Sequence, residues 1–398
     1  MWKLGESRRR FFVDCRRPEE NFWATLFREA GREDLVSGDE YAEYFAITPN
    51  HSNCPEIEQA VKYLVDIAPV EWKATMRNIF VARAFNGEAN AEASSFRSAG
   101  IIELNYGFTL AAMIYSTLFS HFYDAVLTVG TEVDFDDEDS ETTLLIVEEV
   151  ERMAFEPIAA TDEAIGEWAA ARHVQAMHVS QTQLPARRNK EDYHNLVTSV
   201  EQFVIAHEFC HHMLGHTDVQ FRHSRGVRRL VLEKMEGLGI EDLLQEMNPH
   251  QIRELEADVG AFLLLSGYLT SEVKRSRIYR SVGGSFVALV ALAHVAEGWA
   301  SREGEEGDPQ THPDFSTRLE VMYRLVKDMT LGMPVADFGD HPMGFVIQLR
   351  AFAFVVLKTW ASRSNADVQA PRFLNVFSWM LDQQQEFWDE YLGELLPE

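Results

Sequence analysis

The chain has 398 residues, of which 46% are hydrophobic and 25% are charged, and this balance excludes a chain that is disordered as a whole. Its formal net charge of -27 repels phosphate backbones, so we expect no nucleic-acid partner. The length fits one large domain with additions, or two domains.

The cysteines and the apolar stretches indicate a soluble protein of the cytoplasm. The three cysteines (Cys15, Cys54 and Cys210) form no CxxC pair, and their odd number argues against a disulfide framework. Reduced thiols are typical of the cytoplasm, where we expect the protein. Residues 108–127 contain polar groups and residues 282–296 are short for a bilayer, so we interpret both as buried helices and expect no stable membrane insertion.

The N-terminal region predicts short helices, including residues 21–29 and 56–67. The second follows Ser52, Asn53 and Pro55, which suit a helix cap and a first turn. Residue types then change to those of a sheet. The β-branched and aromatic segments 78–85 and 99–105 predict two neighbouring strands, joined by the turn-rich loop NGEANAEASS.

Beyond residue 106 the pattern is mainly helical, apart from the acidic run 132–141. No glycine lies inside that run to make the turn of a calcium loop, so a solvated acidic loop is the better interpretation. A long helix is predicted over residues 192–214, ended by Gly215. Further helices are predicted over residues 144–153, 161–177, 252–265, 282–296, 345–360 and 373–392.

The long helix carries an HExxH motif, His207-Glu208-Phe209-Cys210-His211. Four residues along an α-helix turn by about 400°, so both imidazoles leave the same face about 6 Å apart. They can converge on one zinc ion, and Glu208 at the border of that face can take a proton from the attacking water. The alternative is an ordinary helix whose histidines are satisfied by neighbouring groups.

A catalytic zinc site needs a third protein ligand. The metzincin extension is excluded, because Leu214 and Thr217 occupy the places where it needs glycine and histidine. Glu254 offers the other solution, since the segment Glu-Leu-Glu-Ala-Asp puts Glu254 and Asp258 on one face of a later helix. Asp258 could then accept the Nδ1–H of a ligand histidine, and His207 is the expected partner. We expect Glu256 to point elsewhere and to be solvated.

A third segment reads Thr311-His312-Pro313, followed by Arg318. His312 or Arg318 could donate a hydrogen bond to the oxyanion that develops on a scissile carbonyl. The structural alternative is a helix N-terminus with Pro313 in its first turn and Arg318 in an ion pair. Taken by itself, this segment favours the structural alternative.

Together and in this order, HEFCH (207–211), ELEAD (254–258) and HPDFSTR (312–318) resemble the gluzincin metallopeptidases, in particular the HtpX-like and CAAX prenyl protease family. The resemblance implies Zn²⁺ bound by His207, His211 and Glu254, with Glu208 as general base and acid. It further implies that Asp258 supports a ligand and that His312 and Arg318 lie near the reacting groups.

The family's substrate-binding sheet edge is similar to Asn90-Ala91 and residues 100–105, where an extended peptide could add as a strand. Two features depart from the family. About ninety residues separate Asn105 from the metal helix, and no segment is a convincing transmembrane helix. We therefore expect a soluble relative that cleaves one specific protein substrate, with a regulatory or defence role.

The sequence thus predicts a predominantly helical α+β fold: a zincin-like domain over residues 76–330 with a small sheet and an acidic helical insertion at about 108–190. Helical regions 1–75 and 331–398 flank it. The basic segment 222–234 could bind an acidic part of the substrate or neutralise the insertion. The alternatives to a zinc endopeptidase are a catalytically silent zinc-binding scaffold and an interaction protein with an accidental motif.

Overall fold

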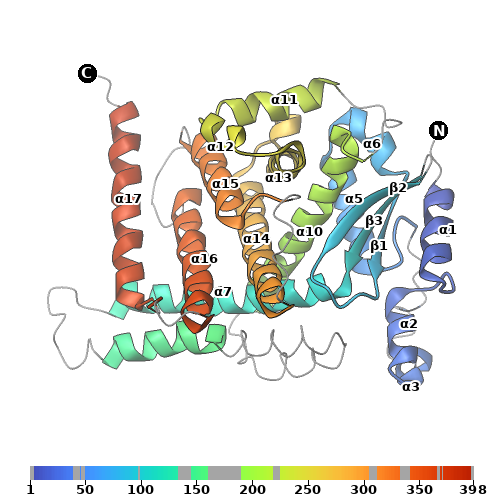
Figure 1. Cartoon of the computed structure of the whole chain (residues 1–398), viewed down its shortest axis with the longest axis horizontal. Coiled ribbons are helices and arrows are strands. Elements are labelled where there is room, and N and C mark those ends of the chain that lie inside the picture. The colour runs from blue at the N-terminus through green and yellow to red at the C-terminus, as the bar shows by residue number, and fades with distance from the viewer. Residues whose placement is uncertain are drawn as a thin grey trace. The chain divides into compact units, whose positions relative to one another are not determined.

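The computed structural model confirms a predominantly helical α+β fold with one small mixed sheet (Figure 1). It describes residues 4–38, 45, 50–96, 99–132, 145–159, 190–217, 225–303, 312–331, 341–364, 368–369 and 371–395. The predicted helix 161–177 and the acidic residues 133–141 lie outside these described ranges.

The chain divides into two compact units. The first consists of Met1–Thr109 and Glu201–Ser281, and the second of Leu110–Val200 and Val282–Glu398. The division falls within three long helices: α7 (Tyr106–Glu132), α10 (Lys190–Leu214) and α14 (Arg275–Glu303). The domain limits expected at residues 75 and 330 remain predictions.

The first unit contains the sheet and the shorter helices. Its strands are β1 (Ile79–Ala84), β2 (Ala91–Phe96) and β3 (Ala99–Asn105). Its other elements are α1 (Leu4–Cys15), α2 (Phe22–Glu29), α3 (Glu33–Ser37), α5 (Pro55–Ile67), α6 (Val70–Met76), α11 (Arg225–Glu236), α12 (Glu241–Gln245), α13 (Pro249–Ser266) and η2 (Tyr268–Thr270).

The sheet has the order β1-β3-β2, with β1 parallel and β2 antiparallel to β3. The two predicted strands are therefore confirmed as neighbours. The segment between them was expected to be a loop, but it contains β2. Alanine, glutamate and serine are weak strand formers, so the composition of β2 hides it. β2 is instead held by its pairing with β3, which runs from Ala91–Leu104 to Phe96–Ala99.

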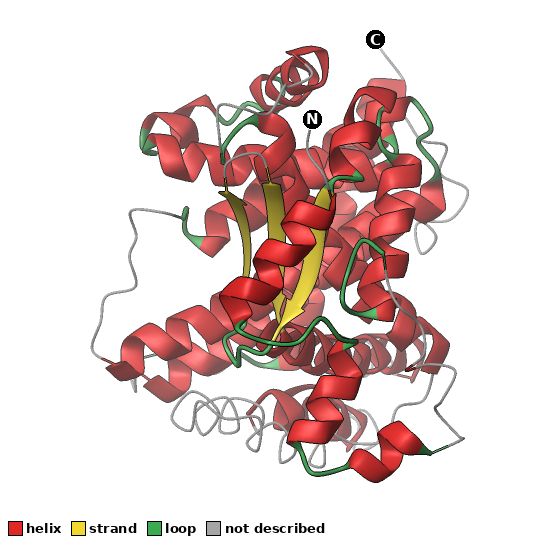
Figure 2. Cartoon of the chain, turned by 90° about the vertical axis from the view of Figure 1, so that its right-hand side faces the viewer, coloured by secondary structure: helices red, strands yellow, loops and turns green. Residues whose placement is uncertain are grey.

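Helices cover both faces of the sheet, which explains why every residue of β1 is buried. In Figure 2, α1 lies across one face, where Phe11 and Phe12 pack against Phe80 and Ile101. The C-terminal half of α10 lies on the other face (Figure 1), and the Nε2–H of His212 donates to the carbonyl oxygen of Ile101 at 3.3 Å. The sheet therefore contacts the helix that carries the HExxH motif directly.

The two predicted N-terminal helices are confirmed, but the start of the second differs in part from expectation. Asn21 caps α2 by accepting hydrogen bonds from two backbone amides. Pro55 starts α5 as predicted, whereas Asn53 does not cap it. The amide of Asn53 instead bonds to both the backbone N–H and the carbonyl of Arg83, at 2.9 and 3.0 Å. The side chain of Asn53 is therefore bonded to the backbone of Arg83 on β1 and not to the first amides of α5.

A buried cation joins β1 to α10. The guanidinium of Arg83 is 1% exposed and lies 3.1 Å from the carboxylate of Glu201, and it also contacts Thr109 and Cys54. Burial alone would lower the pKa of Arg83, but Glu201, Cys54 and Glu56 together outweigh it and raise that pKa. Burial raises the pKa of the Cys54 thiol to about 12, so this cysteine is protonated and structural. The network fixes α10 about one and a half turns before His207.

The described part of the second unit is helical. Besides the first part of α10 and the later parts of α7 and α14, it contains a helix at 145–159, α15 (Phe315–Thr330), α16 (Pro342–Ser364) and α17 (Phe373–Leu395). Two helical stretches, Arg275–Val295 and Pro342–Ser362, are long and apolar enough to cross a membrane. Most of each stretch is buried, and the core helices of soluble proteins share these properties. The cytoplasmic location and the absence of membrane insertion remain predictions.

Candidate metal site

Two helices of the first unit form the site, and the sequence sets where each one begins or ends. The predicted helix 192–214 is α10, and it ends before Gly215, whose φ of 85° favours glycine. α13 begins at a capping box in which the side chains of Asn248 and Gln251 bond to each other's backbone N–H, with Pro249 in the first position. It ends at Gly267, which has a φ of 86°.

The two helices approach closely where Gly260 of α13 faces Cys210 of α10. A Cβ atom on Gly260 would lie 3.0 Å from the Sγ of Cys210, closer than normal van der Waals contact. The absence of a side chain at Gly260 therefore allows this approach. Cys210 itself is fully buried, and burial raises the pKa of its thiol.

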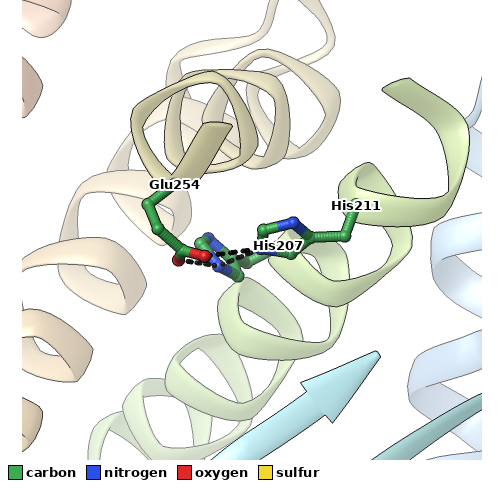
Figure 3. Close-up of side chains that lie close together, drawn as sticks. All are labelled: His207, His211 and Glu254. Carbon is green, nitrogen blue, oxygen red and sulfur yellow. Dashed lines mark hydrogen bonds and ion pairs between the residues drawn. The ribbon is translucent and has the colours of Figure 1, made fainter. Parts of the chain in front are cut away.

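His207, His211 and Glu254 converge between the helices (Figure 3). The Nε2 atoms of the two histidines are 3.0 Å apart. The Glu254 carboxylate lies 3.2 Å from Nε2 of His207 and 3.4 Å from Nε2 of His211. Within the described residues, these ligand atoms form a group that lies within 4.8 Å of one another and can hold a metal ion.

The chemistry of this group fits zinc. Two imidazole nitrogens and one carboxylate oxygen are a known ligand set for catalytic Zn²⁺, whereas calcium and magnesium prefer oxygen ligands. The Nδ1–H of His207 donates to the Oδ1 of Asp258 at 2.9 Å, and this fixes the tautomer whose Nε2 lone pair is available to a cation. Asp258 is fully buried, so this contact is shielded from water.

Electrostatics show how strongly the group attracts positive charge. Burial lowers the pKa of His207, but hydrogen bonds to Asp258 and Glu254 outweigh it and raise the pKa to about 10. Burial raises the pKa of Glu254, but both histidines outweigh it and hold that pKa far below its usual range. Without a metal ion, the group therefore holds a proton where the cation would sit.

Glu208 is buried beside the two histidines, with 7% of its surface exposed. Burial raises the pKa of its carboxyl, and the nearby histidines oppose this shift. A raised pKa makes a carboxylate a better proton acceptor at neutral pH. The acidic residue inside the motif thus has an environment that suits proton transfer.

A further pair of residues, which the sequence did not reveal, lies behind His211. The Nδ1 atoms of His211 and His216 are 3.1 Å apart, and Nε2 of His216 lies 2.9 Å from the Oε2 of Glu256. The expectation that Glu256 is solvated was wrong, because it is 6% exposed. Its helix turns it towards the end of α10, and a pairing across 40 positions of sequence leaves no local signal.

The structure does not bring all predicted site residues into one unit. His312 is exposed and Arg318 is 4% exposed, with its guanidinium over the Phe315 ring at 5.5 Å; both belong to the second unit. Asp314 caps α15 by accepting a hydrogen bond from the backbone N–H of Thr317. Pro313 therefore precedes the cap and does not stand in the first turn of the helix. The catalytic roles of His312 and Arg318 remain predictions.

Asn90 and Ala91 lie where β2 begins, and β2 is an outer strand of the sheet as described. The backbone N–H of Asn105 at the end of β3 donates to the carbonyl of Asn90 at 3.0 Å. Glu92, the next residue of β2, is close enough to contribute to the raised pKa of Glu208. Glu208 thus lies within electrostatic reach of the first residues of the edge strand.

The comparison with protein families gives an independent result. The family model Peptidase U49 matches residues 112–330, more than half of the chain, and this range includes the HExxH motif, Glu254, His312 and Arg318. The chain belongs to the Peptidase U49 family and is thus assigned to the peptidases. Searches of curated proteins and of solved structures gave no match.

Proposed function

We propose that the protein is a zinc-dependent endopeptidase whose metal ligands are His207, His211 and Glu254. The observation that carries the proposal is the convergence of these three side chains, in a member of a peptidase family, beside the buried Glu208. Bound zinc would lower the pKa of water towards 7 and polarise the scissile carbonyl. The gluzincin character of the site is part of this proposal, because its third ligand is a glutamate on a second helix.

Each residue of the site has a chemical task in this mechanism. Glu208 accepts a proton from the attacking water and then donates it to the leaving amine, so it acts first as base and then as acid. Its raised pKa supports both steps, because the carboxyl exchanges its proton more readily at neutral pH. Asp258 holds the ring of His207 in one tautomer and orientation throughout.

The substrate would bind as an extended peptide along β2. An outer strand offers unpaired backbone groups, and pairing with them holds a peptide with little dependence on its sequence. Asn90 and Ala91 would lie next to Glu92, the residue of this edge whose charge acts on Glu208. Selection of one protein substrate, as expected of a regulatory or defence peptidase, would then depend on surfaces outside the cleaved segment.

His312 and Arg318 are proposed to stabilise the oxyanion of the tetrahedral intermediate. Support comes from their inclusion in the family match and from the burial of Arg318, since a guanidinium held away from water interacts more strongly with developing charge. Replacing Arg318 by lysine should then lower kcat more than it raises KM.

The alternative function is a scaffold that binds zinc only to maintain its fold. The burial of Glu208 weighs against it, because structural zinc needs no base and an unused buried carboxylate costs stability. The two functions separate in one experiment. The wild-type protein and Glu208→Gln, each loaded with zinc, are incubated with a proteome from cells that lack the protein, and new N-termini are identified by mass spectrometry.

We expect new N-termini with the wild type and none with Glu208→Gln, although both bind zinc and unfold at similar temperatures. The matched control is Glu236→Gln at the exposed end of α11, which should cleave like the wild type. Equal cleavage by the wild type and Glu208→Gln would show that Glu208 is not the base.

A further inference from the structure

The two histidine ligands are supported from behind in different ways. His207 is bonded directly to a carboxylate, that of Asp258. His211 reaches a carboxylate through an intermediate ring: its Nδ1 lies 3.1 Å from Nδ1 of His216, whose Nε2 lies 2.9 Å from Glu256. The proposed metal site therefore has a carboxylate behind each histidine, and the second one acts through His216.

The hydrogen-bonding capacity of the groups fixes the direction of this relay from Glu256 to His211. Glu256 can only accept when ionised, so Nε2 of His216 carries the proton and its Nδ1 is an acceptor. Nδ1 of His211 must then be the donor, which leaves the lone pair of His211 on Nε2. This is the nitrogen that faces Glu254 and His207. The carboxylate of Glu256 thus sets the tautomer of a ligand two hydrogen bonds away.

The surroundings make this relay strong and specific. The side chains of His216 and Glu256 are 3% and 7% exposed, and hydrogen bonds are stronger where water is excluded. Arg228 of α11 lies 3.6 Å from the same carboxylate oxygen. The guanidinium opposes a second metal ion at this place, because it supplies a positive charge next to the Glu256 carboxylate.

We propose that His216 and Glu256 are positioning residues that hold His211 in the orientation and tautomer required for metal binding. The inference rests on the proposed metal site and extends it to two further residues. His216 lies beyond the HExxH motif, and Glu256 stands at a variable position of ExxAD. It explains why His216, which is not one of the proposed ligands, lies against the ring of His211. Loss of such support behind a metal ligand typically lowers metal affinity by about 10–100-fold.

The competing explanation is structural: the contact between His216 and Glu256 could simply hold the end of α10 against α13. The two explanations predict different measurements. A purely structural contact would stabilise the protein with and without zinc equally, and its removal would leave the zinc affinity of the folded protein unchanged. A positioning contact would change that affinity, even where the metal-free protein unfolds at the same temperature.

The experiment measures the zinc dissociation constant of the folded protein by competition with a chromophoric chelator. The variants are His216→Ala, Glu256→Ala and the double variant, with melting of each metal-free form as a check on folding. The control is His212→Asn, since His212 is fully buried in the same helix but bonds to Thr217 and Ile101. The milder Glu256→Gln keeps the shape of the side chain, in case a larger change unfolds the protein.

We expect each alanine variant to bind zinc about 10–100-fold more weakly, and the double variant to lose no more than the worse single one, because both interrupt one relay. His216→Asn, whose Oδ1 can replace the Nδ1 acceptor, should recover part of the loss. Wild-type affinity in folded His216→Ala and Glu256→Ala would overturn the inference while leaving the proposed function intact. A wild type that binds no zinc would overturn both.

Discussion

Nδ1 of His207 and Oδ1 of Asp258 lie 2.9 Å apart, and Asp258 follows the proposed ligand Glu254 by one turn of the same helix. If the proposed site holds a metal ion, one face of α13 supplies both a ligand oxygen and the group that orients a ligand nitrogen. A displacement of α13 would disturb both together, so the helix must be held firmly against α10.

Replacing Asp258 by asparagine should weaken zinc binding by about 10–100-fold, since the amide is a poorer acceptor and carries no charge. The measurement is chelator competition on the folded variant. Asp242→Asn, at an exposed position of α12, is the control and should bind zinc like the wild type. An unchanged affinity in Asp258→Asn would show that the contact does not serve metal binding.

The stability of the metal-free protein should depend on pH through His207. Its pKa is about 10 in the folded protein and 6.5 without the surroundings of the fold. Because the folded pKa is higher, the stabilisation is complete below pH 6.5 and is lost as pH rises through about 10. Urea unfolding of chelator-treated protein should thus give a free energy of unfolding that falls from pH 6.5 upwards.

Zinc bound at the proposed site would replace this proton, so the stabilisation produced by excess zinc should grow over the same pH range. His207→Gln is the control, and its metal-free form should lose most of the pH dependence in this window. A free energy of unfolding that rises with pH in the metal-free wild type would contradict the assigned protonation of His207.

The buried pair of Arg83 and Glu201 should be costly to break. Glu201→Ala leaves a guanidinium that is 1% exposed without its carboxylate, and such changes cost about 3–5 kcal/mol. Urea unfolding measures the loss. The control is Glu233→Ala, whose ion pair with Arg229 is one helical turn away and exposed, and which should cost below about 1 kcal/mol. Equal losses in the two variants would show that burial does not matter here.

The close approach of α10 and α13 can be tested at Gly260. Alanine favours a helix by about 1 kcal/mol over glycine, but the new Cβ would lie 3.0 Å from Sγ of Cys210. We expect Gly260→Ala to destabilise the protein by about 1 kcal/mol net. In a Cys210→Ala background the same change should become stabilising, because Sγ is gone.

The control for this prediction is Gly130→Ala in α7, where a new Cβ would lie 4.0 Å from its nearest neighbour, the Phe377 ring, and the change should stabilise the protein. Additive effects of Gly260→Ala and Cys210→Ala would contradict a direct contact between the two positions.

Most of the helices could be predicted from the sequence because apolar periodicity and end signals act locally. Asn21 before α2 and Gly215 after α10 are such signals, as are the β-branched residues of β1. β2 could not be predicted in this way, because a strand of alanine, glutamate and serine is stable only through its partner β3.

The candidate site could be predicted only where a fixed spacing along one helix brings two residues to the same face. His207 and His211 share a face by helical geometry, and the same geometry pairs Glu254 with Asp258. The contact of His216 with Glu256, the buried pair of Arg83 with Glu201 and the approach at Gly260 depend on how helices pack. Such contacts join residues far apart in the chain, so no local sequence pattern predicts them.

If His207, His211 and Glu254 bind one zinc ion, the metal content of the purified protein will show it without knowledge of the substrate. Elemental mass spectrometry on purified wild type and Glu254→Ala should find about one zinc per chain in the first and little in the second. No zinc in the wild type, even after reconstitution with added metal, would contradict the claim.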